Sequence, residues 1–260
     1  EIPEIELTPE QLEKANAKES LYVVSNFANE FFQKQLQTDE GLAIAISYFQ
    51  ERDMTDETIQ KFQLGYNPKC WDALTKEALK SGYKKEYLEQ SGLSIFKEDK
   101  SFDRFRGRIM FPIHSLSGRV LGFGGRTLKT EKKIAKYVNS PESDIYHKSK
   151  ILYGIYFAKS IIVKEDCCYL VEGYTDVISM HQSGVENVVA SSGTALSVEQ
   201  IKLISRYTKN IHILFDGDSA GIKASFRSID LILAEGMNVK IVLFPDGEDP
   251  DSYAKKVSSD

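Results

Sequence analysis

The chain has 260 residues, which is enough for one large domain or two modest ones. Hydrophobic residues make up 42% and charged residues 27%, and no apolar run approaches the length of a membrane span, so a globular protein without a membrane anchor is expected. The acidic stretch Glu1 to Glu10 lacks the features of a signal peptide, which favours a cytoplasmic location. Three cysteines, two of them adjacent, argue against a disulfide framework and against a structural zinc.

Charge is distributed unevenly along the chain. Residues 97–160 carry 14 basic and 6 acidic side chains, although the whole chain has a net charge of -5. A basic block between two acidic segments is the asymmetry expected when one segment binds phosphates and another holds a metal ion. A solvated basic face is the alternative. The alternation of these Lys and Arg residues with glycine, aromatic and strand residues favours phosphate binding.

The first third of the sequence has helical spacing. Thr8 and Pro9 form a helix start, and apolar residues from Leu21 to Phe32 follow at helical intervals. Thr38 and Asp39 open a second helix, and further helices are expected at 55–62 and 71–81. Residues 1–92 are therefore interpreted as a helical region whose Phe and Tyr side chains form core.

The period changes at Ser101. Two strand-like runs, 102–113 and 119–126, flank a turn near Ser117 and Gly118, which predicts a hairpin. Glycines in the second run allow close approach of another group, although sheet packing explains them nearly as well. Three arginines of the hairpin could present paired N–H donors to phosphate oxygens: Arg106, Arg108 and Arg126.

A short polar stretch follows the hairpin. It contains Lys136-Tyr137-Val138-Asn139 before Ser140-Pro141, and later Tyr146-His147-Lys148. By spacing alone, Asn139 to Pro141 is as well explained by a turn as by a functional motif. A helix is expected over 151–163, leading into the last third of the chain.

The last third alternates short β-rich runs with helix-length patterns. The runs at 167–171, 211–215 and 239–244 read as buried strands, so the sheet should be largely parallel and the fold class α/β. In such a sheet the carboxyl ends of the strands share one edge, where α/β folds place their sites. The acidic residues that follow the strands should therefore converge there: Glu172, Asp216, Asp218, Asp249 and Asp251.

Converging carboxylates need cations. Two carboxylates about 4 Å apart repel by roughly 4 kcal/mol at an effective dielectric near 20, so such a cluster takes up protons or binds metal. Oxygen ligands without His or Cys suit Mg2+ or Mn2+, and the four scattered histidines are assigned no ligand role. The chemistry indicated is phosphoryl or nucleotidyl transfer.

The same residues resemble a known family. Glu172 after one strand, Asp216-Gly217-Asp218 after a later one and a closing acidic group are similar to the Toprim domain of primases and topoisomerases. Three longer sequence motifs resemble those of the bacterial replicative primase of the DnaG type: 171–177 (VEGYTDV), 192–196 (SGTAL) and 215–221 (FDGDSAG). This resemblance extends over almost the whole chain. It implies an α+β N-terminal subdomain, residues 1–160, followed by a Toprim-type parallel-sheet domain, residues 161–260.

The resemblance also implies roles for individual residues. Glu172, Asp216 and Asp218 would be catalytic. The metal ligands would be the same three residues together with Asp249, Asp251 and Asp176. Nucleotide or template contacts would come from Arg106, Arg108, Arg126, Lys136, Tyr137, Asn139 and Lys148. The implied reaction is synthesis of short RNA primers from NTPs on single-stranded DNA, with Mg2+ or Mn2+ and an RNA–DNA hybrid as product.

Flanking modules of the family are missing from this sequence. The family has a Cys/His zinc-binding module before the core and a helicase-interacting domain after it, so the chain resembles an excised core without zinc. The replicative helicase and single-strand-binding protein would then contact the full-length protein in the bacterial cytosol, at the replication fork.

Two alternatives remain open from the sequence. Another Toprim enzyme is the first: a nuclease would cleave DNA without needing NTPs, and a topoisomerase would need a nucleophilic Tyr in a further domain. A module that binds nucleotides or nucleic acids without catalysis would have kept the fold alone. The complete acidic set favours an enzyme.

Overall fold

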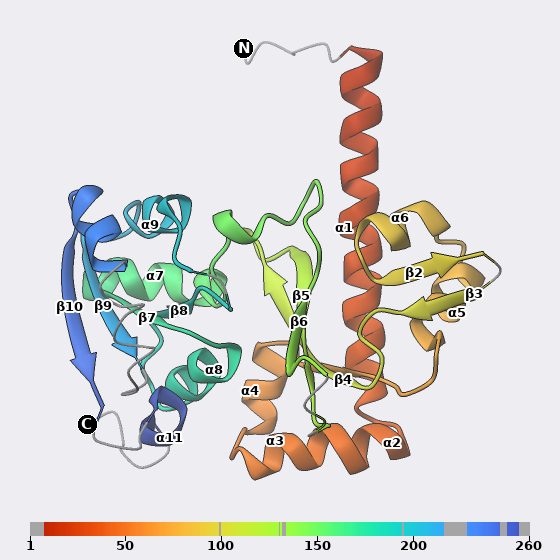
Figure 1. The fold of residues 1–260 in the computed structure, drawn as a ribbon, viewed down its shortest axis with the longest axis horizontal. Coiled ribbons are helices and arrows are strands. Elements are labelled where there is room, and N and C mark those ends of the chain that lie inside the picture. Colours follow the sequence, from red (N-terminus) through yellow and green to blue (C-terminus); the bar gives the residue numbers. More distant parts are fainter. Residues whose placement is uncertain are drawn as a thin grey trace. The chain divides into compact units, whose positions relative to one another are not determined.

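The computed structural model describes residues 8–98, 100–129, 131, 134–193, 195–215, 228–244 and 249–254 (Figure 1). Contacts divide the chain into two compact units. The first contains residues 1–46, 63–112 and 119–146, and the second contains residues 47–62, 113–118 and 147–260. This division follows contacts rather than the order of the chain, so the boundary at residue 160 stays a prediction.

The first unit is an α+β structure. Its helical elements are α1 (Pro9–Gln35), α2 (Asp39–Gly41), the π-helix η1 (Leu42–Ile46), α5 (Ala73–Lys80) and α6 (Lys85–Gln90). Its strands are β1 (Gly65–Asn67), β2 (Ser94–Lys97), β3 (Lys100–Asp103), β4 (Arg108–His114), β5 (Val120–Thr127) and β6 (Tyr137–Asn139). One sheet has the order β1-β4-β5-β6, and β2 and β3 form a separate antiparallel pair.

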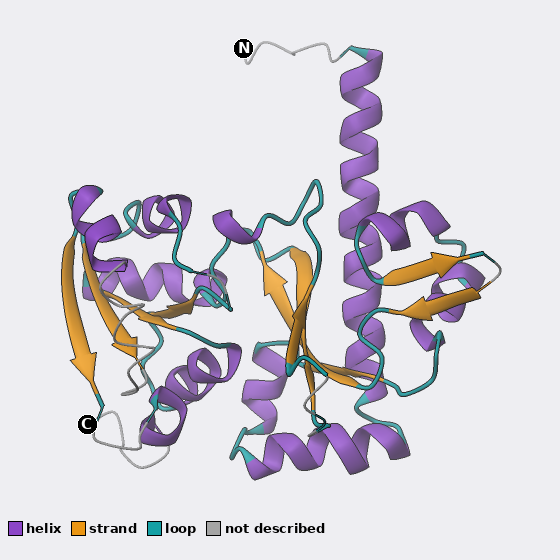
Figure 2. Cartoon of the chain, viewed as in Figure 1, coloured by secondary structure: helices purple, strands orange, loops and turns teal. Residues whose placement is uncertain are grey.

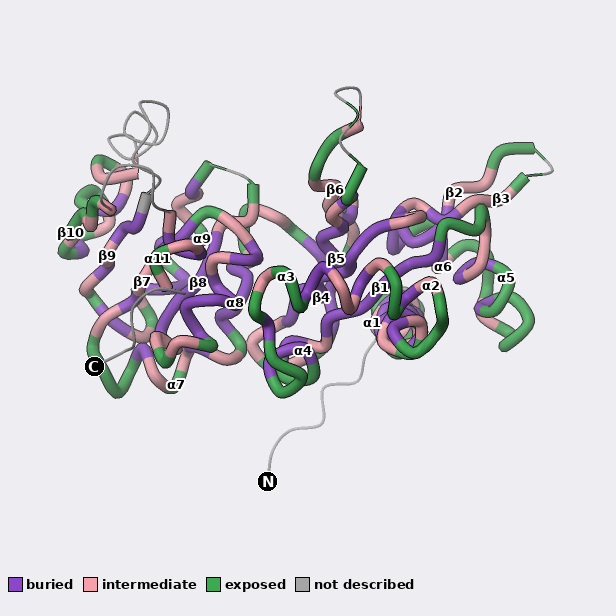
Figure 3. The backbone as a smooth tube through the Cα atoms, turned by 90° about the horizontal axis from the view of Figure 1, so that it is seen from below, coloured by how far each residue is buried: buried purple, intermediate pink, exposed green. Residues whose placement is uncertain are grey.

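Apolar faces of α1, α5 and α6 form the core of the first unit with the four-stranded sheet. Val24 and Phe32 of α1 are fully buried in one cluster with Phe105, Met110 and Phe123. β4 is buried along its whole length, as Figure 3 shows, and only Arg126 of β5 is half-exposed. A sheet covered in this way provides a rigid support for the loops at its ends.

The predicted hairpin is present. β4 and β5 are neighbours in the sheet, and the Gly118 N–H donates to the Ser115 carbonyl oxygen at 3.0 Å. Gly118 has φ = 86°, a left-handed conformation that favours glycine at this turn. The turn of the hairpin therefore lies at the position that the sequence predicts.

The second unit has a parallel sheet with helices on both faces (Figure 2). Its strands are β7 (Cys168–Val171), β8 (Val188–Ala190), β9 (Asn210–Phe215) and β10 (Asn238–Leu243), in the order β10-β9-β7-β8. The pairs β10–β9, β9–β7 and β7–β8 are all parallel. The helices are α3 (Ser47–Glu51), α4 (Asp56–Lys61), α7 (Ile155–Glu165), α8 (Tyr174–Gln182), α9 (Val198–Ile204) and α11 (Pro250–Ala254), with the 3-10 turn η2 (Lys148–Lys150).

Alternation along the strands separates two layers of side chains. Cys168 and Leu170 of β7 pack with Ile211 of β9 against helices α7 and α9. Tyr169 and Leu214 point to the opposite face, where side chains of α8 and α11 lie around a pocket of about 220 Å³. A three-layer α/β arrangement results, which confirms the predicted fold class.

Some local expectations were wrong. The helix expected over 151–163 begins at Ile155, because Tyr153 forms a bridge with Ala190 and extends the chain there. Within the region interpreted as helical, residues 65–67 form a strand, since they pair with β4. The antiparallel pair β2–β3 was not predicted. All three cysteines are free, and no described helix combines the length and the apolar character needed to cross a bilayer.

His114 is a buried titratable group of the second unit. Its ring lies 5.4 Å from that of Phe157 and 5.9 Å from that of Tyr156. Burial lowers the pKa of His114 to about 4. The imidazole is therefore neutral in the folded protein between about pH 4 and pH 6.5, where an unfolded chain would hold the proton.

We expect this difference to make stability fall as the pH falls from about 6.5 to about 4. The unfolded state binds the additional proton, so His114 alone should cost on the order of 2 kcal/mol between pH 7 and pH 5. Thermal unfolding of His114→Leu should show a smaller loss of Tm over this range than the unsubstituted chain. His147→Leu, at an exposed position, is the control and should keep the original pH dependence. Equal pH dependence in all three proteins would contradict this assignment.

Candidate functional site

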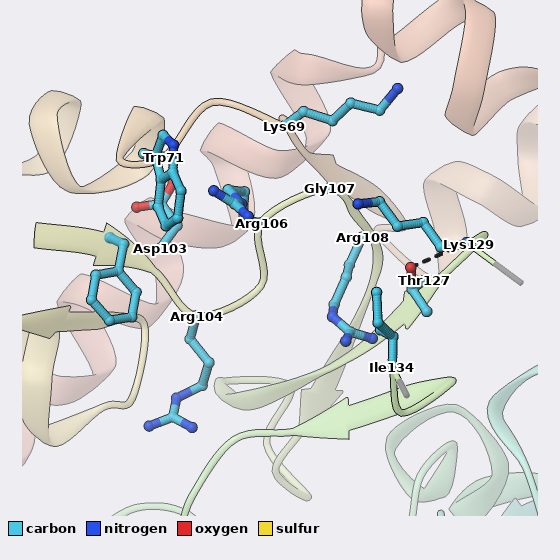
Figure 4. A pocket seen from close by; sticks show the side chains of 11 residues that line it. Lys69, Trp71, Asp103, Arg104, Arg106, Gly107, Arg108, Thr127, Lys129 and Ile134 are labelled. Atoms are coloured by element: carbon cyan, nitrogen blue, oxygen red, sulfur yellow. Dashed lines mark hydrogen bonds between the residues drawn. The ribbon is translucent and has the colours of Figure 1, made fainter. Parts of the chain in front are cut away.

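A basic pocket of about 610 Å³ lies in the first unit (Figure 4). Cationic side chains line it from β1 to the end of β5: Lys69, Arg104, Arg106, Arg108 and Lys129. Asp103 contributes a carboxylate to the lining of this pocket, and both oxygens of that carboxylate accept hydrogen bonds within the protein. Burial lowers the pKa of Arg104 and Arg108, so the pocket is a place where an anion would relieve unfavourable charge.

Trp71 and Arg106 form a stacked pair at this pocket. The guanidinium carbon of Arg106 lies 3.7 Å from the centre of the Trp71 ring, and Figure 4 shows the two side chains side by side. The Phe102 ring packs edge-on against the Trp71 ring, with 6.3 Å between the two ring centres. Trp71 is 64% exposed, although it is held on two sides. An exposed aromatic face beside cations suits a base stacked above and phosphates alongside.

Asp103 fixes the backbone that carries Trp71. Its carboxylate accepts hydrogen bonds from the backbone N–H groups of Leu74 and Thr75, at 2.9 and 3.0 Å, and from the Thr75 hydroxyl at 2.6 Å. Its own N–H donates to the Trp71 carbonyl oxygen at 2.7 Å. Burial raises the pKa of Asp103, and these hydrogen bonds oppose the rise. The start of α5 is thus capped by a residue from β3.

Arg108 is buried within the first unit. One guanidinium nitrogen donates to the carbonyl oxygens of Gly125, Ala135 and Lys136, at 3.1, 3.1 and 3.3 Å. Gly125 permits this approach, because a Cβ there would lie 2.7 Å from the Phe105 ring and 3.1 Å from the Arg108 side chain. These bonds hold the segment before β6 against β5. The predicted template contact of Arg108 remains a prediction, while its observed contacts are with the backbone.

The other predicted contacts of this unit lie on β5 and β6. Arg126 donates to the Tyr137 hydroxyl at 2.9 Å, and the two residues pair directly across the strands. Lys136 is exposed and its carbonyl oxygen accepts from Thr127 at 2.9 Å. Asn139 ends β6 opposite Gly124. Arg126, Lys136, Tyr137 and Asn139 are therefore brought together on one pair of strands.

In the second unit, Glu172 and Asp176 lie where β7 leads into α8. Glu172 is exposed directly after the strand, and the Ser192 N–H donates to its carbonyl oxygen at 3.1 Å. The Asp176 carboxylate accepts from the Gly173 N–H at 2.9 Å and caps α8. A Cβ at position 173 would lie 3.0 Å from that carboxylate, so a larger residue there would require the Asp176 side chain to shift. Both acidic residues are thus placed by the strand-to-helix turn.

Asp249 and Asp251 lie at the start of α11, which packs against α8. Asp249 caps the helix by accepting from the Ser252 N–H at 2.7 Å. Asp251 is buried, and its two oxygens contact Arg52 of the α3–α4 connection and the Ser179 hydroxyl of α8. Sequence reasoning did not predict Arg52, which also lies 5.4 Å from the Tyr48 ring.

These carboxylates have the donor chemistry of a site for a hard divalent cation. Asp216 and Asp218, which would complete the set, fall outside the described residues. Within the described part of the chain, no three His, Cys, Asp or Glu side chains are grouped closely enough to hold a metal ion. The all-oxygen set fits Mg2+ or Mn2+ in type, and its ligand assignments stay predictions.

Sequence reasoning missed several residues of the basic pocket: Lys69, Trp71, Arg104 and Lys129. Trp71 was interpreted as part of a helix, although it lies just before α5 and is largely exposed. It is the chain's single tryptophan and follows Lys69 by two positions, a signal that could have indicated a stacking surface.

Comparisons with known proteins identify two families along the chain. The family described as "DNA primase catalytic core, N-terminal domain" matches residues 31–159, and the Toprim-like family matches residues 169–254. A DNA primase of Halalkalibacterium halodurans is 44% identical over 251 residues, which cover 95% of this chain and 41% of that protein. The chain spans about two fifths of the length of the curated relatives it matches.

Solved structures resemble the chain over most of its length. The RNA polymerase domain of Mycobacterium tuberculosis primase DnaG has a TM-score of 0.83 and 36% identity, covering 91% of this chain and 81% of that domain. A DnaG primase catalytic domain bound to ssDNA has a TM-score of 0.84 and 37% identity, covering 93% of this chain and 76% of that one.

An α+β unit with a cationic pocket, together with a parallel sheet followed by acidic residues, defines a Toprim-class protein of nucleic-acid metabolism. Within that class, the chain belongs to the DnaG family of DNA primases and corresponds to its catalytic core.

Arg106 and Arg108 allow a matched test of the hydrogen bonds by which Arg108 holds the segment before β6 against β5. Arg108→Met should lower the free energy of unfolding by about 2–4 kcal/mol, because it removes a buried charged donor that is shared by three carbonyl oxygens. Arg106→Met, two residues away and partly exposed, should change it by less than about 1 kcal/mol. Urea denaturation measures both. Equal stabilities of the two variants would contradict a structural role for Arg108.

Proposed function

We propose that this chain is the catalytic core of a bacterial DNA primase, which synthesises short RNA primers from NTPs on single-stranded DNA. The observation that carries the proposal is the combination, in a DnaG-family chain, of an exposed stacking surface among cations with acidic residues at the strand ends of a parallel sheet. An RNA–DNA hybrid is the expected product. Helicase and single-strand-binding protein are expected partners of the full-length protein.

The basic pocket would bind the template. A base can stack on the exposed face of Trp71, while Lys69, Arg104 and Lys129 neutralise neighbouring phosphates. Arg106 keeps the indole ring in place by stacking on it. None of these contacts reads a base edge, so the pocket would bind single strands with little sequence preference. A relative bound to ssDNA supports a single-stranded ligand.

The family resemblance indicates contacts with nucleotide or template for Arg126, Lys136, Tyr137 and Asn139 of the first unit and for Lys148 of the second, and we assign these residues to the nucleotide. Arg126 and Lys136 carry permanent charges suited to triphosphate oxygens, and the hydrogen bond from Arg126 orients the Tyr137 ring. Held in this way, a triphosphate would lose little further freedom on reaching its reactive geometry.

Glu172, Asp176, Asp216, Asp218, Asp249 and Asp251 would hold Mg2+, with Mn2+ as a substitute. When bound, such ions orient the attacking 3'-hydroxyl and the triphosphate and neutralise the charge that develops. Glu172 is exposed after β7 and is suited to accept the hydroxyl proton. Arg52 of the α3–α4 connection and Ser179 of α8 hold the Asp251 carboxylate, and Asp249 is oriented by its capping bond.

Primer synthesis tests the proposal directly. With labelled NTPs, single-stranded DNA and Mg2+ or Mn2+, the chain should make short RNA that disappears when a chelator is added. Glu172→Gln and Asp216→Asn should each lower the rate at least about 100-fold, because they remove charge from the metal and proton-transfer positions. Glu165→Gln, an exposed carboxylate at the end of α7, should have no effect.

Other outcomes separate the alternatives. Cleavage of DNA without a need for NTPs would assign the chain to the Toprim nucleases. Binding of DNA and NTPs without synthesis, under conditions in which a full-length relative is active, would favour a module without catalysis. Unchanged synthesis in Glu172→Gln and Asp216→Asn would overturn the proposed mechanism.

Template binding gives an independent prediction. Trp71→Ala should weaken binding of a labelled single-stranded oligonucleotide about tenfold, since stacking contributes about 1–3 kcal/mol per base. Trp71→Phe should retain most of the affinity. Arg104→Met should reduce the dependence of binding on salt concentration, because it removes a phosphate contact. Fluorescence anisotropy at several salt concentrations measures these effects, and equal affinity of Trp71→Ala and the unsubstituted chain would contradict the stacking role.

A further inference from the structure

Gln200 is a fully buried glutamine at the start of α9 whose hydrogen-bonding groups are all occupied. Its Oε1 accepts from the Ser197 N–H at 3.0 Å, which is one half of the capping box of the helix. Its Nε2 donates to the carbonyl oxygens of Lys148 and Ile151, at 3.0 and 2.8 Å. Both N–H groups of the amide are thus directed at the segment that carries Lys148.

Ser197 reinforces the same contact. Its hydroxyl accepts from the Gln200 N–H at 3.1 Å, as the other half of the capping box, and donates to the carbonyl oxygen of Ser149. The two capping side chains therefore hold carbonyl oxygens of Lys148, Ser149 and Ile151, all in or next to η2. The bonds of a capping box are made only to N–H groups of the helix itself. The three bonds to the carbonyl oxygens of Lys148, Ser149 and Ile151 are additional, and they stabilise the neighbouring segment.

The turn η2 has little local support of its own. It is a single 3-10 turn with no buried side chain, and its Lys150 N–H donates to the His147 carbonyl oxygen at 2.9 Å. Short 3-10 turns have poor hydrogen-bond geometry and do not fix a long side chain by themselves. The hydrogen bonds from α9 supply this support, because a buried amide that loses its partners is unfavourable and the contact therefore resists rearrangement.

We propose that Gln200 is a positioning residue for Lys148, fixing the backbone of η2 so that the lysine ammonium is held ready for a nucleotide phosphate. The inference rests on the proposed function, in which Lys148 contacts the incoming nucleotide. Gln200 itself touches no substrate. Its contribution is to reduce the freedom that the Lys148 backbone would otherwise lose on binding.

Substitutions can separate the helix cap from the positioning role. Gln200→Glu retains an oxygen for the Ser197 N–H but removes both N–H donors to η2. Gln200→Met has the same length and removes all three bonds. Asn187→Leu is the matched control, because Asn187 is also a buried amide and donates to the Cys167 carbonyl oxygen at 2.9 Å, at the amino ends of the strands.

The experiment measures binding of labelled ATP with Mg2+, together with hydrogen exchange of the peptide that contains residues 147–152. Gln200→Glu and Gln200→Met should weaken ATP binding about tenfold and speed exchange in this peptide, while Asn187→Leu should do neither. In a Lys148→Ala background, either change at Gln200 should alter ATP affinity by less than about twofold, because its effect passes through Lys148.

Each result decides the question. Faster exchange at 147–152 with unchanged ATP affinity would overturn the positioning role, and so would an equal loss of affinity with and without Lys148. Unchanged exchange in both Gln200 variants would show that η2 does not depend on this residue. Failure of the unsubstituted chain to make primers would contradict the proposed function, whereas the coupling between Gln200 and Lys148 in ATP binding is measured without primer synthesis.

Discussion

Repulsion between like charges is the constraint on which the acidic half of this protein depends. A parallel sheet brings its strand ends to one edge, and the sequence places carboxylates there. The fold meets this constraint with local partners. Asp176 and Asp249 accept backbone N–H groups at helix starts, and Asp251 faces a guanidinium and a hydroxyl. Backbone N–H groups, a guanidinium and a hydroxyl thus offset the negative charge of these carboxylates locally.

Backbone carbonyl groups have a corresponding role in the basic segments. Arg108 and Gln200 are buried, and both direct N–H groups at carbonyl oxygens of segments that carry a lysine. Lys136 and Lys148 differ in sequence context and belong to different units. In both cases the hydrogen bond is made to the backbone of the segment. Rigid support beneath a flexible side chain is thus a recurring arrangement in this chain.

The sequence was sufficient to predict the parts of the fold that have local signatures. Apolar runs separated by helix-length patterns predicted the parallel sheet, and Ser117-Gly118 predicted the hairpin turn. Strands β1, β2 and β3 are short and pair over long distances, so periodicity within the segment did not reveal them.

For the site residues too, those with a local sequence signature could be predicted and those that depend on long-range packing could not. Acidic residues at strand ends could be named from position alone, and the structure describes Glu172, Asp176, Asp249 and Asp251 near α8 and α11. Burial of Arg108 and exposure of Trp71 could not be predicted, because they depend on which segments pack together in three dimensions. Arg52 was missed for the same reason, since its partner Asp251 is 199 residues away.

The exposed indole has a practical consequence for studying this chain. Trp71 is its single tryptophan, so intrinsic fluorescence excited at the indole band comes from one position in the basic pocket. Because the ring is largely open to water, its emission should respond when a flat aromatic ligand covers it. The protein therefore contains its own spectroscopic reporter of pocket occupancy, and ligands can be followed there without attaching a dye.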